Sequence, residues 1–482
     1  MQEQQTHIIK KASLDFMYHG KEDGFALQKE VKDWLQQFMD QLNTELESYC
    51  NADAVITLDK LQLNVNLRNK QWKEEATKQL LFQLRDKLQL YRSGSVAKAG
   101  YKEVKVVQHF EEEFLFYLKH GFTSWKTSVE QKANWFEKVE QLFIQPDIQF
   151  LQQLLQLLKQ NDNGIVRLKE ALPAAVQLNL FQPLFKTDEH YQQYTNDLQL
   201  LVENLSSSAQ IKELLLKTAL QIAGNWKDET FIEYAAVTLF QQLQQTAAIQ
   251  PKSLQIISFQ SKLFKKAQSQ IARAEKNVQQ IDEQKQSSFT RKQLTDEAAL
   301  NKLLQEEQQH EQTSIAEEGI FISNAGLVLV AAFLPVLFAK VNITAENELL
   351  HVRDAVCLLH VIATGAVPKD ETGLVLPKIL CGLHPSQALE VSAFTVSDIM
   401  KEEINNMLAS VIEYWNVLGD TSVAGLQESF LQRNGKLLLR NGEWILQVEQ
   451  QPYDMLLQHL PWNMSMIQLP WMKQMLKTEW FY

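Results

Sequence analysis

Hydrophobic residues recur with two different spacings along the first hundred positions of the chain. Apolar side chains return every three or four residues at 25–49 and again at 72–91, which is the spacing of an amphipathic helix. Residues 8–18 and 55–67 are predicted as strands. In the second, apolar and polar positions alternate, and a change of phase near Asp59 predicts a bulge or a turn there. The pattern therefore predicts a strand–helix–strand–helix unit over residues 1–98.

The next part of the chain is rich in Leu and Gln and has helical spacing almost throughout. We expect a helical domain of short antiparallel helix pairs over residues 99–251. Its clearest helices are predicted at Phe110–Leu118, Trp135–Phe143, Phe150–Leu158, Ile211–Ile222 and Phe231–Leu243.

Residues 252–318 differ from both neighbours, because apolar residues become sparse and charged and Gln residues fill the intervals. No Pro or Gly occurs from Ser253 to Glu318. Two interpretations fit this composition. The segment is either a long exposed helix or loose coiled coil, which would reach about 100 Å at 1.5 Å per residue, or a flexible polar linker.

The last region, residues 319–482, opens with an uncharged stretch from Gly319 to Ala339. Its length alone would admit a membrane span. However, Asn324, Gly326 and Pro335 interrupt it, so we expect a short extended piece followed by a buried core helix. Asn324 is the expected N-cap of that helix. Stable membrane insertion is therefore not expected.

The remainder of this region is predicted to be mostly helical and to carry one β-hairpin. Helices are expected at 352–364, 398–417 and 423–432. Strands at 436–440 and 444–449 flank Asn441-Gly442, a pair that favours the type I′ turn of a hairpin. The fold class is thus mainly α, with a small α+β N-terminal unit and a mostly helical C-terminal domain carrying a β-hairpin.

Composition excludes several classes of function. The formal net charge is −11, which disfavours nucleic acid as a partner because binding to phosphates grows with the number of Lys and Arg contacts. Three widely spaced cysteines indicate a reducing compartment, and the N-terminus shows no signal-peptide pattern. These features predict a cytoplasmic protein.

The sequence contains no phosphate loop, dinucleotide fingerprint or nucleophile elbow. Only the neighbourhood of His351, Asp354, Cys357 and His360 suggests a metal site, and apolar residues surround it. A core histidine beside a buried thiol is the expected arrangement. No catalytic, cofactor-binding or metal-binding residue is therefore predicted, and the chain is expected not to be an enzyme.

Short apolar and aromatic phrases in the last region supply the candidate residues instead. Two Leu-Pro-Trp triplets, at 460–462 and 469–471, combine a fixed backbone with a large apolar ring. They suit either the core or an interface, and the sequence leaves both open. Arg433 is expected to hold a buried carboxylate, either Asp454 or Glu428. The full set of interaction or structural candidates is Pro377, Lys378, Arg433, Tyr453, Asp454, Trp462, Pro470 and Trp471.

Several of these phrases, taken in order, resemble the C-terminal region of contractile injection system tape measure proteins, found in phage-tail-like particles of the anti-feeding-prophage type. The phrases that carry the resemblance include Asn324–Leu329, Arg353–Val356, Leu374–Gly382 and Glu428–Arg433, followed by the two Leu-Pro-Trp triplets. The ordered run extends from about residue 319 to Trp480. Over the first two hundred residues the resemblance is weaker.

The resemblance implies a non-enzymatic protein that sets tube length or assists assembly of a bacterial contractile injection system. Its implied partners are tube, baseplate or cap proteins, with a second copy of the chain as a further partner. It would act in the cytoplasm and could remain in the assembled particle. The alternative is a helical adaptor, terminator or chaperone-like scaffold that measures no length.

Overall fold

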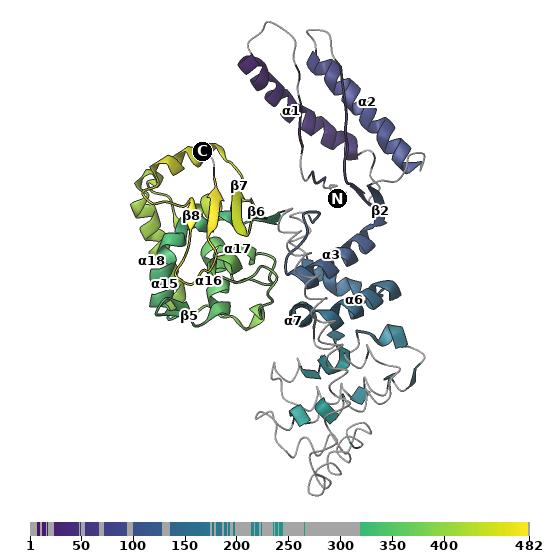
Figure 1. Cartoon of the computed structure of the whole chain (residues 1–482), viewed down its shortest axis with the longest axis vertical. Coiled ribbons are helices and arrows are strands. Elements are labelled where there is room, and N and C mark those ends of the chain that lie inside the picture. Colours follow the sequence, from purple (N-terminus) through teal and green to yellow (C-terminus); the bar gives the residue numbers. More distant parts are fainter. Residues whose placement is uncertain are drawn as a thin grey trace. The chain divides into compact units, whose positions relative to one another are not determined.

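A computed structural model of the protein describes residues 24–47, 54–66, 72–93, 100–127, 135–173 and 319–480 without interruption, together with short pieces before and between them (Figure 1). Two compact units are present. The first contains residues 1–113 and 126–133, and the second contains residues 114–125 and 134–482.

The first unit is built on two amphipathic helices, α1 (Gly24–Glu47) and α2 (Trp72–Arg92), which pack against each other (Figure 1). Their buried contact consists of Trp34, Phe38, Ala76 and Leu80. The indole N–H of Trp34 donates to the Thr77 hydroxyl at 3.0 Å. Both helices were predicted from their spacing, within one or two residues at each end.

A two-stranded antiparallel ladder joins β1 (Ala54–Leu58) to β2 (Tyr101–Lys105), with Ala54 opposite Lys105. The predicted strand at 55–67 is shortened, because the backbone of Asn64 pairs with a side chain of α2 instead of a strand. Asn64 N–H donates to Gln83 Oε1 at 3.1 Å, and Gln83 Nε2 donates to the Asn64 carbonyl at 2.6 Å. Sequence patterns did not predict β2, and the described residues of 8–18 lie outside the ladder.

The second unit begins with short helices, of which the first three were predicted, whereas the helix at 162–171 and the turn at 182–185 were not. They are the end of α3 (Val106–His120), α5 (Trp135–Leu142), α6 (Ile148–Gln160) and α7 (Asp162–Ala171), followed by the 3₁₀ turn η1 (Gln182–Phe185). Asp147 caps α6, and the Asn161 side chain accepts from Gly164 N–H to cap α7. The helices predicted at 211–222 and 231–243 fall largely outside the described residues, and the segment 252–318 does so except for Lys265.

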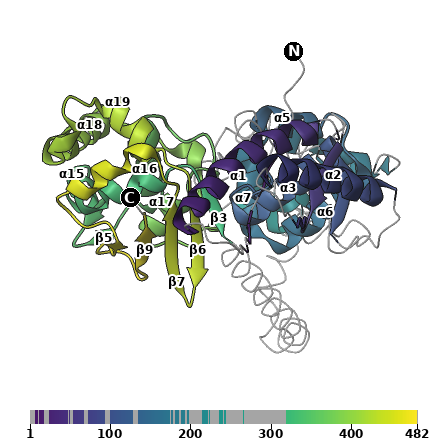
Figure 2. The same ribbon diagram turned by 90° about the horizontal axis from the view of Figure 1, so that it is seen from above.

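A mixed five-stranded sheet runs through residues 319–480 in the order β3-β6-β7-β9-β8 (Figures 1 and 2). Its strands are β3 (Ile320–Ile322), β6 (Gly435–Arg440), β7 (Glu443–Val448), β8 (Met466–Ile467) and β9 (Leu476–Glu479). The predicted hairpin is β6–β7, with positive φ at both turn residues, 53° at Asn441 and 78° at Gly442. β9 lies parallel to β7. A short separate ladder joins β4 (Thr344–Ala345) and β5 (Glu348–Leu349).

Helices surround this sheet and supply most of the core. They are α15 (Leu334–Lys340), α16 (Val352–Thr364), α17 (Val375–Leu380), α18 (Asp398–Tyr414) and α19 (Val423–Leu426), which continues into the π-helical turn η5 (Gln427–Leu431). The 3₁₀ segments are η2 (Ala325–Phe333), η3 (Val391–Ala393), η4 (Asn416–Leu418) and η6 (Pro452–His459). The mainly α fold class, with its α+β N-terminal unit and C-terminal hairpin, is confirmed.

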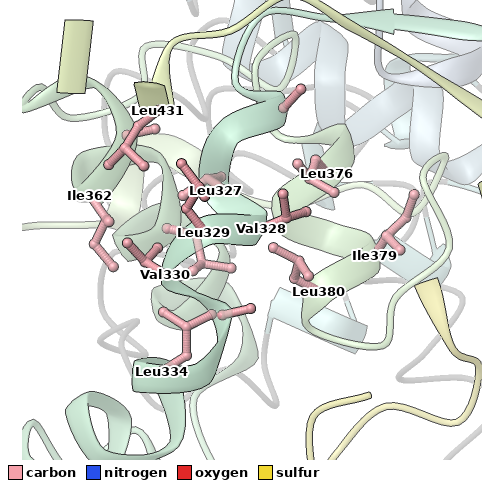
Figure 3. Packing of buried hydrophobic residues seen from close by; sticks show 14 of the residues in the cluster. Leu327, Val328, Leu329, Val330, Leu334, Ile362, Leu376, Ile379, Leu380 and Leu431 are labelled. Atoms are coloured by element: carbon pink, nitrogen blue, oxygen red, sulfur yellow. The ribbon is translucent and has the colours of Figure 1, made fainter. Parts of the chain in front are cut away.

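The uncharged stretch 319–339 forms the centre of this domain. It divides into β3, the 3₁₀ segment η2 and α15, and its residues from Ala325 to Val330 are all buried. Figure 3 shows their side chains meeting those of α16, α17 and η5. Asn324 was expected to cap a helix with its side chain, but its Nδ2 donates to the Gly373 carbonyl at 2.8 Å instead. Within the described residues, no helix is both long and apolar enough to cross a membrane.

Gly326 fixes how closely η2 approaches η5. A Cβ atom at this position would lie 1.7 Å from the carbonyl oxygen of Phe430 and 2.7 Å from the Cα of Leu431. Both are backbone atoms, so no side-chain rotation relieves the overlap. The two segments therefore pack backbone against backbone, and only glycine permits this contact.

We expect Gly326→Ala to destabilise the C-terminal domain by about 3 kcal/mol, because the added methyl group forces η2 away from η5. Denaturation by urea, followed by tryptophan fluorescence, measures the change. Gly425→Ala is the matched control, since a Cβ there meets only side-chain atoms at 3.2 and 3.3 Å and alanine favours a helix. Equal stability of the two variants would contradict the prediction.

Candidate functional site

A buried ion pair joins Arg433 to Asp454 in the C-terminal domain. Arg433 lies between η5 and β6, and Asp454 lies in η6. The guanidinium donates from both terminal nitrogens, to Asp454 Oδ1 at 2.8 Å and to Oδ2 at 2.9 Å. Both side chains are almost fully buried. Of the two carboxylates named for Arg433 from the sequence, the structure selects Asp454.

The Asp454 carboxylate has two further donors. Oδ2 accepts from the backbone N–H of Gln451 at 2.8 Å and from the indole N–H of Trp480 at 3.0 Å. Burial opposes ionisation, but these bonds and the guanidinium of Arg433 hold the pKa of Asp454 below its ordinary value. The rings of Tyr453 and Trp480 lie 5.3 and 5.2 Å from the guanidinium carbon. Such contacts stabilise a desolvated cation.

Both candidate tryptophans make hydrogen bonds inside the domain. Trp462 donates to the Leu329 carbonyl at 2.9 Å, and its ring meets Phe333 edge-on at 5.0 Å. Trp471 donates to the Leu380 carbonyl at 2.8 Å and stacks on Phe338 at 5.3 Å. Each ring is half-buried at the margin of the core, whereas Pro470 is exposed. The two triplets therefore attach the last segment to η2, α15 and α17.

A second charged cluster surrounds Glu371. Lys378, in α17, donates to Glu371 Oε2 at 2.5 Å and to the Pro385 carbonyl at 3.1 Å. Arg167, in α7, reaches the same Oε2 atom with Nε at 3.3 Å. The other oxygen of Glu371 accepts from Leu389 N–H at 2.9 Å. All three charged side chains are at most 2% exposed, so they form a desolvated triad of two cations and one anion.

Backbone carbonyls complete the coordination of Arg167. Its terminal nitrogens donate to Leu118 at 2.9 Å, to Lys119 at 3.2 Å and to Ser386 at 2.5 Å. These oxygens carry partial negative charge, which compensates the excess cation of the triad. The guanidinium therefore binds the end of α3 and the loop around Ser386 at the same time.

Burial shifts the proton affinities of this region strongly. It lowers the pKa of Lys378 to about 8, against the attraction of Glu371. It lowers the pKa of His120 to about 3, and the nearby charges of Lys119 and Arg167 act in the same direction. Burial also raises the pKa of Tyr117 well above its ordinary value. Such shifts mark functional and structural clusters alike.

The sequence region considered as a metal site is apolar. Burial raises the pKa of Cys357 to about 12 and lowers that of His360 to about 4. Cys381 is also buried. In the part of the chain that the structure describes, no three His, Cys, Asp or Glu side chains gather closely enough to hold a metal ion. At neutral pH these pKa values leave the His360 imidazole uncharged and the Cys357 thiol protonated.

One known protein family matches almost the whole chain. The family model for contractile injection system tape measure proteins matches residues 6–480. The chain belongs to this family. Membership supports a role in tube length in a contractile injection system, and the match covers the N-terminal residues where the sequence resemblance was weak. Searches of curated proteins and of solved structures find no match to the chain.

In this tape measure protein, the sequence had pointed to three residues of the two charged clusters, Lys378, Arg433 and Asp454. It gave no indication of Arg167 and Glu371. Lys378 was named because it stands in the phrase Leu374–Gly382, which carries part of the family resemblance. Pro377, beside it, is buried in the first turn of α17, where a missing N–H costs little. Arg167 stands in an ordinary amphipathic helix, so its sequence carries no comparable signal.

Replacing Asp454 by Ala should reduce the free energy of unfolding by about 3–5 kcal/mol, because it leaves the Arg433 guanidinium buried without a counter-ion. Calorimetric melting measures the loss. The control, Glu443→Ala, removes the exposed pair with Lys477 and should change stability by less than about 1 kcal/mol. Similar losses in the two variants would rule out a dominant contribution from the buried pair.

The low pKa of His360 predicts that the folded protein loses stability in acid. Between pH 4 and 6.5 the unfolded chain binds a proton at this imidazole that the folded chain does not. Stability therefore rises with pH through this window and falls by up to about 3 kcal/mol on acidification. Urea denaturation at pH 7.5 and 4.5 should show a smaller fall for His360→Gln than for the unmodified protein. His120 leaves some acid sensitivity in both. An identical fall in stability in the variant and the unmodified protein would show that other groups cause the acid sensitivity.

Proposed function

We propose that the chain is a non-enzymatic assembly protein that determines tube length in a bacterial contractile injection system. The observation that carries the proposal is the family match along residues 6–480. The protein contacts tube, baseplate or cap proteins in the bacterial cytoplasm during assembly and becomes part of the particle.

The chemistry of the described charged clusters agrees with a structural role. Asp454 and Glu371 accept hydrogen bonds on both carboxylate oxygens from groups of the same chain. A general acid or base needs an oxygen that reaches substrate, and these oxygens are buried among internal donors. Arg433, Asp454, Lys378 and the adjacent Pro377 accordingly serve to hold the C-terminal domain together.

The exposed candidates are better placed for a partner. Tyr453 is 38% exposed, and its hydroxyl donates to the Ser429 carbonyl at 3.1 Å, which holds the ring in position. Pro470 is exposed, and the rings of Trp462 and Trp471 are half-buried. We propose that these four residues, held from beneath by the core, contribute to the surface that meets the assembly partner.

A second candidate function is an adaptor, terminator or chaperone-like scaffold. It is favoured by the small size of the polar segment 252–318, which would span only about 100 Å as a helix. Both functions predict loss of particles when the gene is deleted, so deletion alone does not separate them.

Changing the length of the polar segment separates the two functions. If it measures the tube, duplication of residues 252–318 should lengthen tubes in electron micrographs by about 100 Å, and its deletion should shorten them by a similar amount. The control carries the same extra residues after Tyr482, where they should leave tube length unchanged. Tubes of normal length from the duplicated chain would reject measurement by this segment and leave the scaffold function.

A further inference from the structure

Helices α15 and α18 of the C-terminal domain pack side by side (Figures 1 and 2). Lys340, at the end of α15, pairs with Glu403, near the start of α18, at 2.7 Å. Beyond the other end of α15, the rings of Phe333 and Tyr414 stack with their centroids 6.3 Å apart. Glu403 and Tyr414 are three helical turns apart and face the same side of α18. The two helices therefore run antiparallel, and a straight seam lies between them.

Large apolar side chains are exposed along this seam, which we call the α15–α18 strip. Val336 lies one turn after Phe333, and Ile399 lies one turn before Glu403. Val336, Ile399 and Tyr414 are 63%, 66% and 65% exposed, respectively. From Ile399 to Tyr414 the strip is about 22 Å long at 1.5 Å per residue. Exposed apolar side chains gathered on one surface are typical of sites that bind another protein.

One end of the strip is formed by three aromatic rings. The ring of Phe333 contacts both Tyr414, on which it stacks, and Trp462, which meets it edge-on at 5.0 Å. The hydrogen bond from the Trp462 indole to the Leu329 carbonyl fixes that ring in place. Because these rings are already packed against one another, a partner that binds them loses little conformational entropy at this point.

The strip carries an excess of negative charge. The lysines of the two helices are both paired with carboxylates of α18. Three further carboxylates, Glu402, Glu413 and Asp420, have no cationic partner in the part of the chain that the structure describes. Such a surface attracts Lys and Arg side chains, which also bind favourably to the faces of Tyr and Trp rings. It repels phosphate groups and a second copy of the same strip, so nucleic acid, an anionic membrane and self-association are disfavoured here.

We propose that the α15–α18 strip is the docking site for a positively charged amphipathic helix of another assembly protein. This inference rests on the proposed function and adds the chemistry of the partner. The apolar side chains of such a helix pack between the ridges of α15 and α18. Its Lys and Arg side chains meet Glu402, Glu413 and Asp420 at the margin, and a length of about 22 Å accommodates roughly fifteen helical residues.

The docking site can be tested by photo-crosslinking in cells that produce particles. Val336 or Tyr414 is replaced by p-benzoylphenylalanine, and the cells are irradiated during assembly. We expect a covalent product with another protein of the particle. Mass spectrometry should place the crosslink in a segment with net positive charge and helical spacing of apolar residues. The control is the same replacement at Val367, which is 45% exposed outside the strip and should not give this product.

Three results of the crosslinking would overturn the docking site. The first is the absence of a product specific to positions 336 and 414. The second is a product formed only with a second copy of the chain, and the third is a crosslinked segment of net negative charge.

Charge reversal tests the charge of the partner. Glu413→Lys combined with Asp420→Lys should lower the crosslink yield from position 336 about ten-fold or more, because like charges then face the partner. Asp33→Lys combined with Asp86→Lys is the matched control, since it changes the net charge equally at exposed positions of α1 and α2. Circular dichroism verifies that all variants fold. Equal yields from the two double variants would overturn the positively charged partner.

Failure of the docking site and failure of the proposed function give different results. A crosslink to a positively charged helix of a protein outside the injection system would reject the proposed function and retain the strip as a docking site. Tubes that lengthen after duplication of residues 252–318, together with no crosslink from the strip, would overturn the docking site alone.

Discussion

The arrangement of the C-terminal domain depends on one carboxylate. Asp454 accepts four hydrogen bonds, from both terminal nitrogens of Arg433, from the Gln451 backbone and from the Trp480 indole. These donors come from the connection before β6, the start of η6 and the residue after β9. Because a buried charge must be satisfied where it lies, the positions of all three segments are fixed together. The hairpin, the 3₁₀ turn and the last strand then form one interlocked layer.

Helices were the part of the fold that the sequence predicted best. The periodicity at 352–364 and the Asn441-Gly442 turn are local signals, and the structure has α16 and the β6–β7 hairpin at those positions. The mixed sheet was not predicted, because β3, β8 and β9 have only two to four residues each. Strands this short contain too few alternations to show a period. The close approach of η2 to η5 at Gly326 was not predicted either, because it is a tertiary contact and leaves no local pattern.

The two charged clusters differ in predictability for a similar reason. Arg433 and Asp454 are 21 residues apart within one ordered set of phrases, so a buried pair was a reasonable hypothesis. Arg167 and Glu371 are 204 residues apart, and each stands in a sequence that looks solvent-exposed. Their burial is decided by the packing of α7 against the loop that contains Ser386. Only a three-dimensional arrangement brings such residues together.

The place of β9 in the sheet has a consequence for the order of synthesis. This strand lies between β7 and β8, although it is the last of the five in the sequence. The ribosome therefore makes the rest of the domain before the strand that joins β8 to the hairpin exists, and Trp480 reaches Asp454 later still. Chains interrupted before Leu476 lack the strand that links β7 to the edge strand β8. Completion of the five-stranded sheet and of the hydrogen bonds to Asp454 thus requires synthesis at least as far as Trp480.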